Sequence, residues 1–432
     1  MTTKRTERTV VRRPRDRKAR IADAAAELFY ERGYHNVGLD DVAAAVGITG
    51  GAIYKHFRGK QELLERVVSD AMSAVEAAIA EVDESGECAV QLRAIVQGAA
   101  DAMMDRREIG VLLQRESPHL DPLQQEQLAV RVGDTFRRSG RLVQCVRPEL
   151  TESEALRLAR STFAALASVS YHQTVIPRRP GQDLLEAMAL TVLASHTFDE
   201  PQDYNDRSPG AVDGRSVSDS IVERASRREM LVSAAIPLFA SRGYHDVSME
   251  DLGAAAGIRG PSIYRYFPSK LDVLIAVLSR ISEWLELGMS VALSQADGPS
   301  DALHRVVRGY VEFVLDNRDL MTIFLHERVH LPEDQIELGT RVQRDYLAEW
   351  ARLVRACRPE LTEPEARLLT HGVLSLVNDN VRSSTMPNPS IGTLTTIAEE
   401  ILLRSGSVPS SEILAPSTEN KAKRRKRPAT AQ

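Results

Sequence analysis

The chain has 432 residues, of which 43% are hydrophobic and 27% charged, and its formal net charge is -5. This length exceeds the usual size of one domain and predicts two or three domains. Aromatic residues are few and stretches rich in Ala, Leu, Glu and Arg are common, which excludes a β-sandwich or a collagen-like fibre and predicts an all-α fold.

No apolar run approaches the roughly 18 residues that a membrane span needs. The basic N-terminus has no hydrophobic segment behind it and so does not read as a signal peptide. We therefore expect a cytoplasmic, nucleoid-associated protein without membrane contact. Cys88, Cys145 and Cys357 stand far apart without C-x-x-C spacing, so we expect reduced, buried thiols, no disulfide framework and no metal or other cofactor.

The chain repeats itself. Residues 28–60 and 238–270 share an Arg-Gly-Tyr-His sequence and a Gly-Ile pair at a spacing of 210, and Arg-Pro-Glu-Leu-Thr-Glu recurs farther on at a spacing of 211. A domain of about 190 residues is thus duplicated. The expected division is a basic arm and helix-turn-helix over 1–60, a helical body over 61–198, a flexible linker over 199–216, a second helix-turn-helix over 217–270, a second body over 271–405 and a disordered basic tail over 406–432.

Each copy begins with the pattern of a helix-turn-helix. In the first copy a helical stripe over 21–32 ends at a glycine, and Asp40 is placed to cap a second helix. A three-residue turn over 47–49 then leads to a third helix over 50–57.

The third helix is expected to face DNA. Ile53 and Phe57, four residues apart, should pack inward on the first two helices. The small residues at its start would let the backbone approach DNA, and the polar residues that follow could reach phosphates. The outward residues are Gly50, Gly51, Ala52, Tyr54, Lys55 and His56.

Several short motifs of this region resemble the TetR family of bacterial transcriptional regulators: Gly33-Tyr34, Asp41-Val42-Ala43, Val46-Gly47-Ile48, Ile53-Tyr54, His56-Phe57 and Lys60. The two copies together resemble the tandem, double-TetR type. The resemblance implies DNA-binding domains, larger ligand-binding and dimerisation domains, and repression relieved by a small molecule. It also implies that Thr49, Tyr54, Lys55 and Lys60 lie at DNA, with Lys60 on a phosphate.

The second copy departs from this pattern. Arg259 replaces Thr49, Pro261 replaces Gly51, and Pro237 lies inside the first helix, which it should bend. We still expect DNA contact through Arg259, Gly260, Pro261, Ser262, Tyr264, Arg265, Tyr266 and Lys270. Because the two recognition segments differ, the operator should be non-palindromic, with half-site centres about 34 Å apart or a multiple of that.

Both ends of the chain are basic. Residues 1–20 contain nine Lys or Arg against two acidic residues, and a position just before a helix-turn-helix favours phosphate or minor-groove contact by Arg13 and Arg15 over a merely solvated arm. The cluster over 421–427 could make nonspecific DNA contact or serve solubility alone.

One segment, His326-Glu327-Arg328-Val329-His330, matches the H-E-x-x-H zinc pattern. Pro332 follows closely and the first copy lacks the first histidine, so a structural turn or a part of a ligand site is the simpler interpretation. A zinc hydrolase is kept as an alternative, although we expect no enzyme.

Apolar residues at helical spacing line the bodies and predict a Met-lined cavity for an apolar, lipid-like effector. The candidate ligand-binding residues are Met72, Met103, Trp284, Tyr310 and Phe313, with Tyr171, His172 and Asn378 as polar contacts. By analogy with the family, the two copies should pair within one chain as a pseudo-dimer. The pairing should join residues 131–146 and 152–171 to residues 341–357 and 363–380. A higher oligomer of several chains is kept as an alternative.

The predicted function is a repressor that binds double-stranded operator DNA and is released by its effector. A nonspecific architectural DNA-binding protein is the second alternative.

Overall fold

The computed structural model describes residues 15–80, 82, 85–195, 226–258, 260–382 and 389–406, which are helical and contain no strand. The all-α prediction is confirmed. The arm before Arg15, the linker over 199–216 and the tail beyond Gly406 lie outside the described residues.

The first copy contains nine α-helices within the described range, with short 3₁₀ and π segments between some of them. Their bounds are α1 (Arg15–Arg32), α2 (Leu39–Ala45), α3 (Gly50–Ile53), α4 (Lys60–Ala80), α5 (Cys88–Asp105), α6 (Ile109–Val111), α7 (Pro122–Val146), α8 (Glu152–Leu166) and α9 (Arg178–Ala194). The intervening segments are η1 (Tyr34–Asn36), the π-helical η2 (Leu112–Glu116), η3 (Ser117–His119) and η4 (Ala167–Tyr171).

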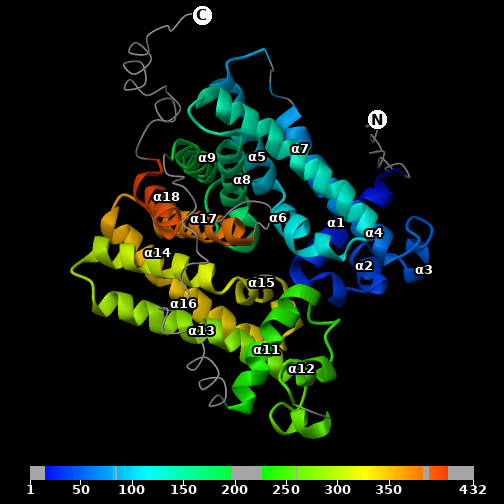
Figure 1. Ribbon diagram of the computed structural model, residues 1–432. Coiled ribbons are helices and arrows are strands. Elements are labelled where there is room, and N and C mark those ends of the chain that lie inside the picture. Colours follow the sequence, from blue (N-terminus) through cyan, green and yellow to red (C-terminus); the bar gives the residue numbers. More distant parts are fainter. Residues whose placement is uncertain are drawn as a thin grey trace, which may run out of the picture.

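The second copy repeats this order. Its elements are α11 (Arg227–Arg242), α12 (Met249–Ala255), η6 (Gly260–Arg265), α13 (Lys270–Ser294), α14 (Pro299–Asp316), α15 (Arg318–His326), η7 (Arg328–His330), α16 (Glu333–Cys357), α17 (Glu363–Arg382) and α18 (Ile391–Arg404). We call α1–α3 and α11–η6 the heads, and the remaining helices of each copy its body. Both heads lie on the same side of the molecule (Figure 1).

Glycines end the helices of the heads, as their spacing predicts. Gly33 and Gly47 have φ values of 78° and 69°, a left-handed conformation that favours glycine after a helix. The predicted cap of α2 was wrong: the capping carboxylate is that of Asp41, whose Oδ2 accepts from the Gly38 amide at 2.6 Å. Asp40 instead lies against Gly50, where any Cβ would collide with its carboxylate.

Two further expectations about the heads need correction. The third helix of the first copy is only four residues long, because turns replace regular helix after Ile53. The first helix begins at Arg15, upstream of the predicted start. In the second copy, Pro237 lies inside α11, which continues past it to Arg242, and the bend expected there stays a prediction.

A disulfide in the first body contradicts the expectation of three reduced thiols. Cys88 at the start of α5 and Cys145 near the end of α7 are bonded, with their Cα atoms 6.1 Å apart. The two residues are 57 positions apart in the sequence, and only the packing of α5 on α7 brings them together. Cys357 is a free thiol, and burial raises its pKa.

The two copies pack against each other inside the chain, through α8 and α9 of the first and α17 and α18 of the second (Figure 1). The hydroxyl of Ser375 donates to the Ala164 carbonyl at 2.7 Å, and the Asn380 amide donates to the Ser161 hydroxyl at 2.8 Å. This contact between Ala164 and Ser375 lies within the predicted ranges 152–171 and 363–380. The assignment of α7 and α16 to this interface was wrong, because they pack chiefly on helices of their own copies.

Candidate DNA-binding heads and effector cavity

In the first head, the predicted inward and outward faces of the recognition segment are found. Ile53 and Phe57 are fully buried, whereas the Tyr54 ring is 61% exposed and Lys55 is exposed beside it. Thr49 precedes the helix without a side-chain capping bond. Gly51 is exposed, and Gly50, Ala52 and His56 are partly exposed. The segment therefore offers small residues followed by a tyrosine and a lysine.

In the second head, the corresponding segment is the 3₁₀-helix η6. Gly260 has a φ of 56°, and the proline that follows has no amide hydrogen to donate. Ile263 and Phe267 are buried, while Ser262, Tyr264 and Arg265 are exposed and Tyr266 is partly exposed. Arg259 and Arg13, together with the side chains of Pro261 and Arg15, lie outside the described residues.

Lys60 and Lys270, both expected at DNA, begin α4 and α13, and their ammonium groups contact the turn after the first helix of each head. Lys270 donates to the carbonyls of Tyr244 and His245 at 2.6 and 3.1 Å, and Lys60 donates to the His35 carbonyl at 3.3 Å. Each ammonium also lies over a tyrosine ring, that of Tyr34 or Tyr244. Desolvation lowers the pKa of both lysines.

Four histidines meet where the heads approach each other, and we call them the histidine cluster: His35, His119, His245 and His330. The His35 and His245 rings, one from each head, have centroids 4.6 Å apart. His35 Nε2 and His119 Nδ1 share a hydrogen bond of 3.2 Å. The rings line a cavity of about 490 Å³ between the copies. This site was not predicted, although the Gly-Tyr-His motif that occurs once in each copy contains two of its four histidines.

A second cavity lies inside the first body. Its volume is about 220 Å³, and helices α4 to α8 line it, with one residue from the second copy. Met72 and Met103 both line it. Sequence reasoning missed Arg160, which lies 3.8 Å from Asp379 of α17 at the wall of this cavity. The cavity is apolar with a few polar groups, which suits an amphipathic small molecule.

The other candidate ligand residues lie elsewhere. The Tyr171 hydroxyl lies within hydrogen-bond distance of the Gly110 carbonyl and of Gln114 Oε1. His172 stacks on His371 of the second copy, with ring centroids 4.2 Å apart. In the second body the aromatic candidates pack against neighbours: Trp284 stacks on Phe313 at 3.9 Å, and the Tyr310 hydroxyl donates to Asn378 at 3.0 Å.

The wall of the cavity in the first body continues directly into the first head. Leu113 and Gln114 line the cavity, and the next two residues hold the end of α1. The Arg115 guanidinium donates to the carbonyls of Phe29 and Tyr30 at 2.7 and 2.9 Å. Glu116 pairs with Arg115 and accepts from the Tyr34 amide at 2.9 Å. A shift of this segment would therefore move the first head.

The H-E-x-x-H segment does not form the helical zinc motif. Helix α15 ends at His326, and residues 328–330 form a 3₁₀ turn. His330 Nε2 instead lies 3.3 Å from Glu327 Oε2. Within the described ranges, no three His, Cys, Asp or Glu side chains converge in a geometry that could hold a metal ion.

Two helix-turn-helix heads on paired helical bodies, one of which encloses an apolar cavity, define a DNA-binding transcriptional regulator. The family of bacterial regulatory proteins, tetR family, matches residues 21–67 and 231–277, and a tetracyclin repressor-like C-terminal domain matches residues 296–382. The chain belongs to this TetR family, and it carries the family's DNA-binding domain twice. No helix in the described part of the chain has the length and apolar character of a membrane span.

Relatives with similar sequences are also regulators. The transcriptional activator FasR of Mycolicibacterium smegmatis is 28% identical over 160 residues, which cover 37% of this chain and 72% of FasR. The transcriptional repressor KstR2 of the same species is 28% identical over 130 residues, or 29% of this chain and 63% of KstR2. The solved structure of the ketosteroid regulator KstR2 of Mycobacterium tuberculosis is 21% identical and covers 41% of this chain and 93% of its own, with a TM-score of 0.37.

Proposed function

We propose that this protein is a repressor whose two heads bind one operator together and whose affinity falls when a small apolar molecule enters the first body. The observation that carries the proposal is the continuous segment from cavity wall to head. A ligand against Leu113 would displace Arg115 and Glu116, which hold the end of α1 and the turn after it. Ligand binding thus favours a different head position, as a population shift requires.

The effector would have an apolar body and at least one polar group. Met72, Met103, Phe136 and Phe163 supply a flexible, apolar lining, and Arg160 supplies a charged group at the wall. Fluorescence anisotropy with labelled operator and a set of sterols, fatty acids and their coenzyme A esters tests this point. A rise in the operator Kd supports the proposal, and an unchanged Kd with every compound contradicts it.

The operator should be non-palindromic. The first head presents Tyr54 and Lys55, whereas the second presents Tyr264 and Arg265 after a proline. An arginine can bind guanine bidentately, with about 1–3 kcal/mol of discrimination between bases, whereas a lysine near a phosphate adds affinity for any sequence.

Genome-wide mapping of bound DNA would supply the operator, and footprinting with either half inverted tests its asymmetry. Inversion should weaken binding, and Lys55→Ala and Arg265→Ala should weaken protection of different halves. Equal affinity after inversion would show that the heads recognise the same sequence. A specific regulator should prefer its site by about 10³-fold or more, whereas an architectural protein would not. Reporter expression in a deletion strain distinguishes repression from activation.

In solution the pairing of bodies should make the single chain a self-contained pseudo-dimer. The buried contacts between α8 and α17 support this proposal. Light scattering at low concentration tests it, with the mass of one chain as the expected result and an obligate two-chain assembly as the contrary one. We also propose that the head-to-body boundaries fall near Lys60 and Lys270.

A further inference from the structure

The body helices of the two copies can be matched residue by residue. Helix α5 spans Cys88–Asp105 and α14 spans Pro299–Asp316, so equivalent positions differ by 211. The same difference aligns the ends of α7 and α16 and the starts of α8 and α17. The α4 and α13 helices both start at a lysine and differ by 210. This alignment identifies the side chains of the second body that stand where the first body has its cavity.

At the centre of that place the second copy has a bonded pair of larger side chains. Tyr310 stands where the first copy has Ala99, and Asn378 stands where it has Ala167, which lines the cavity. The Tyr310 hydroxyl donates to Asn378 Oδ1 at 3.0 Å, and the tyrosine is buried. Through Asn378, the pair therefore occupies the place of a residue that lines the cavity in the first body.

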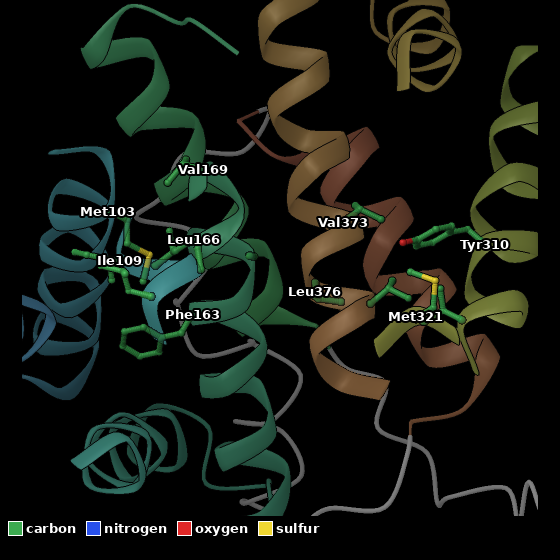
Figure 2. Packing of buried hydrophobic residues seen from close by; sticks show 14 of the residues in the cluster. Met103, Ile109, Phe163, Leu166, Val169, Tyr310, Met321, Val373 and Leu376 are labelled. Atoms are coloured by element: carbon green, nitrogen blue, oxygen red, sulfur yellow. The ribbon is translucent and has the colours of Figure 1, made fainter. Parts of the chain in front are cut away.

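Three more exchanges enlarge side chains around this pair. Met321 replaces Gly110 and Tyr346 replaces Thr135, both of them cavity-lining positions in the first copy, and Trp350 replaces Ser139. Tyr310 and Met321 lie together beside Val373 and Leu376, whereas Met103, Ile109 and Phe163 group separately in the first body (Figure 2). Other positions have a smaller side chain in the second copy, such as Leu374 in place of Phe163. These exchanges remove fewer atoms than the exchanges to larger side chains add.

The aromatic side chains of the second body pack on one another. Trp350 is fully buried, and its ring meets the rings of Tyr310 and Tyr346 edge to face, each at 6.0 Å between centroids. Such packing fills a core to the density of an organic crystal and has no room for a ligand unless several rings move together.

The second copy does have a groove of about 260 Å³, between α13 and α16. Only Ser282 and Phe324 of its lining match positions that line the first cavity, and Glu283, Glu286 and Arg328 make it more highly charged. It is thus a different site, and a ligand found there would not be at the equivalent of the first cavity.

We propose that only the first copy binds the effector, so that one chain takes one amphipathic ligand, and that the second copy acts as a ligand-free partner whose core is closed by aromatic side chains. This inference rests on the proposed effector control. A ligand in the first body still contacts the second copy, because Asp379 of α17 lines the cavity beside Arg160. One ligand can therefore act on the first head through Arg115 and on the second copy through α17.

Xenon-pressurised crystals of the full chain test the inference without knowledge of the effector, because xenon enters apolar cavities. Xenon density is expected beside Met72 and Phe163 and not between Tyr310 and Trp350. Density at the second place, or none at the first, would overturn the inference.

A reciprocal pair of variants provides the control. Thr135→Tyr gives the first copy the side chain of the second and should abolish the xenon site, whereas Tyr346→Thr should open a new one. If Tyr346→Thr does not fold, the unmodified chain and Thr135→Tyr still test whether xenon enters the first body alone. Xenon in the first body alone, with no compound that changes the operator Kd, would refute effector control while the closed second core stands.

Discussion

His172 of the first copy and His371 of the second stack on each other at the interface between the bodies, with ring centroids 4.2 Å apart. His172 Nδ1 is within hydrogen-bond distance of the Arg107 guanidinium at 3.3 Å and accepts from the Thr174 amide at 3.1 Å, so this nitrogen carries no proton. Desolvation, assisted by His371 and Arg107, lowers the pKa of His172 to about 2. Desolvation, assisted by Arg367 and Arg107, lowers that of His371 to about 4.

The stacked pair predicts that acid lowers the free energy of unfolding of the chain. The unfolded chain binds a proton at each histidine near pH 6.5, above the folded pKa values, so stability is full above that pH and falls as the pH drops toward 4. For His371 alone the loss of unfolding free energy should be on the order of 3 kcal/mol. Denaturant titrations between pH 7.5 and 4 measure it.

His371→Phe keeps the ring contact and removes one titrating group, so its stability should depend less on pH. Ser375→Ala, which removes a hydrogen bond from the same interface and no titrating group, is the control and should keep the pH dependence of the unmodified chain. An equal slope for His371→Phe and the unmodified chain would exclude the stacked pair as the cause.

The histidine cluster predicts a pH dependence of operator binding. Desolvation first, and then His119, His245, His330 and Lys60, lower the pKa of His35 to about 4. Protonation between pH 6.5 and 4 would place like charges on opposing rings and push the heads apart. Glu327 and Asp246 nearby, and Glu116 in the lining of the same cavity, would offset part of the repulsion.

Operator affinity at constant ionic strength should therefore fall as the pH is lowered through this range. The double variant His35→Gln and His245→Gln should show a flatter pH profile than the unmodified protein. The His371→Phe variant is the matched control, because it removes a histidine from the bodies and leaves the heads intact. A profile unchanged by the double variant would mean that the cluster does not set the head spacing.

Replacement of Arg115 should loosen the first head alone. Arg115→Met would leave the Phe29 and Tyr30 carbonyls without their charged donor, at a cost of about 1.5–3 kcal/mol. Hydrogen exchange of amides over residues 29–37 should accelerate, and operator release by an effector should weaken. His326→Met, at the equivalent position of the second copy, is the control and should leave exchange over 29–37 unchanged. Equal exchange in both variants would argue against Arg115 as the link.

The disulfide between Cys88 and Cys145 should stabilise the first body. The bond closes a loop across 57 positions of the sequence and so restricts the conformations of the unfolded chain. In the chain-entropy model this restriction stabilises the folded state by about 4 kcal/mol. Reduction, or Cys88→Ser, should lower the unfolding free energy by up to this amount, and Cys357→Ser should not. Identical denaturation curves with and without reductant would show that the bond does not form in the folded protein.

The sequence alone was sufficient for features that depend on near neighbours in the chain. The duplication, the helical composition and the i, i+4 spacing of Ile53 and Phe57 predicted two heads and the buried face of the first recognition segment, and both of those side chains are buried. Helix formation and amphipathic burial follow from hydrogen bonds and side chains within a few turns, so such patterns are visible in the sequence.

Only the tertiary structure decided which distant segments meet. The Cys88–Cys145 bond, the His35–His245 contact and the pairing of α8 with α17 join residues that are far apart in the sequence. The same holds for the cavity: Thr135, which lines it, and Tyr346, its equivalent in the second copy, each look like an ordinary helix residue. Whether such a position faces open space or a filled core depends on how several helices pack together, and no local spacing encodes that packing.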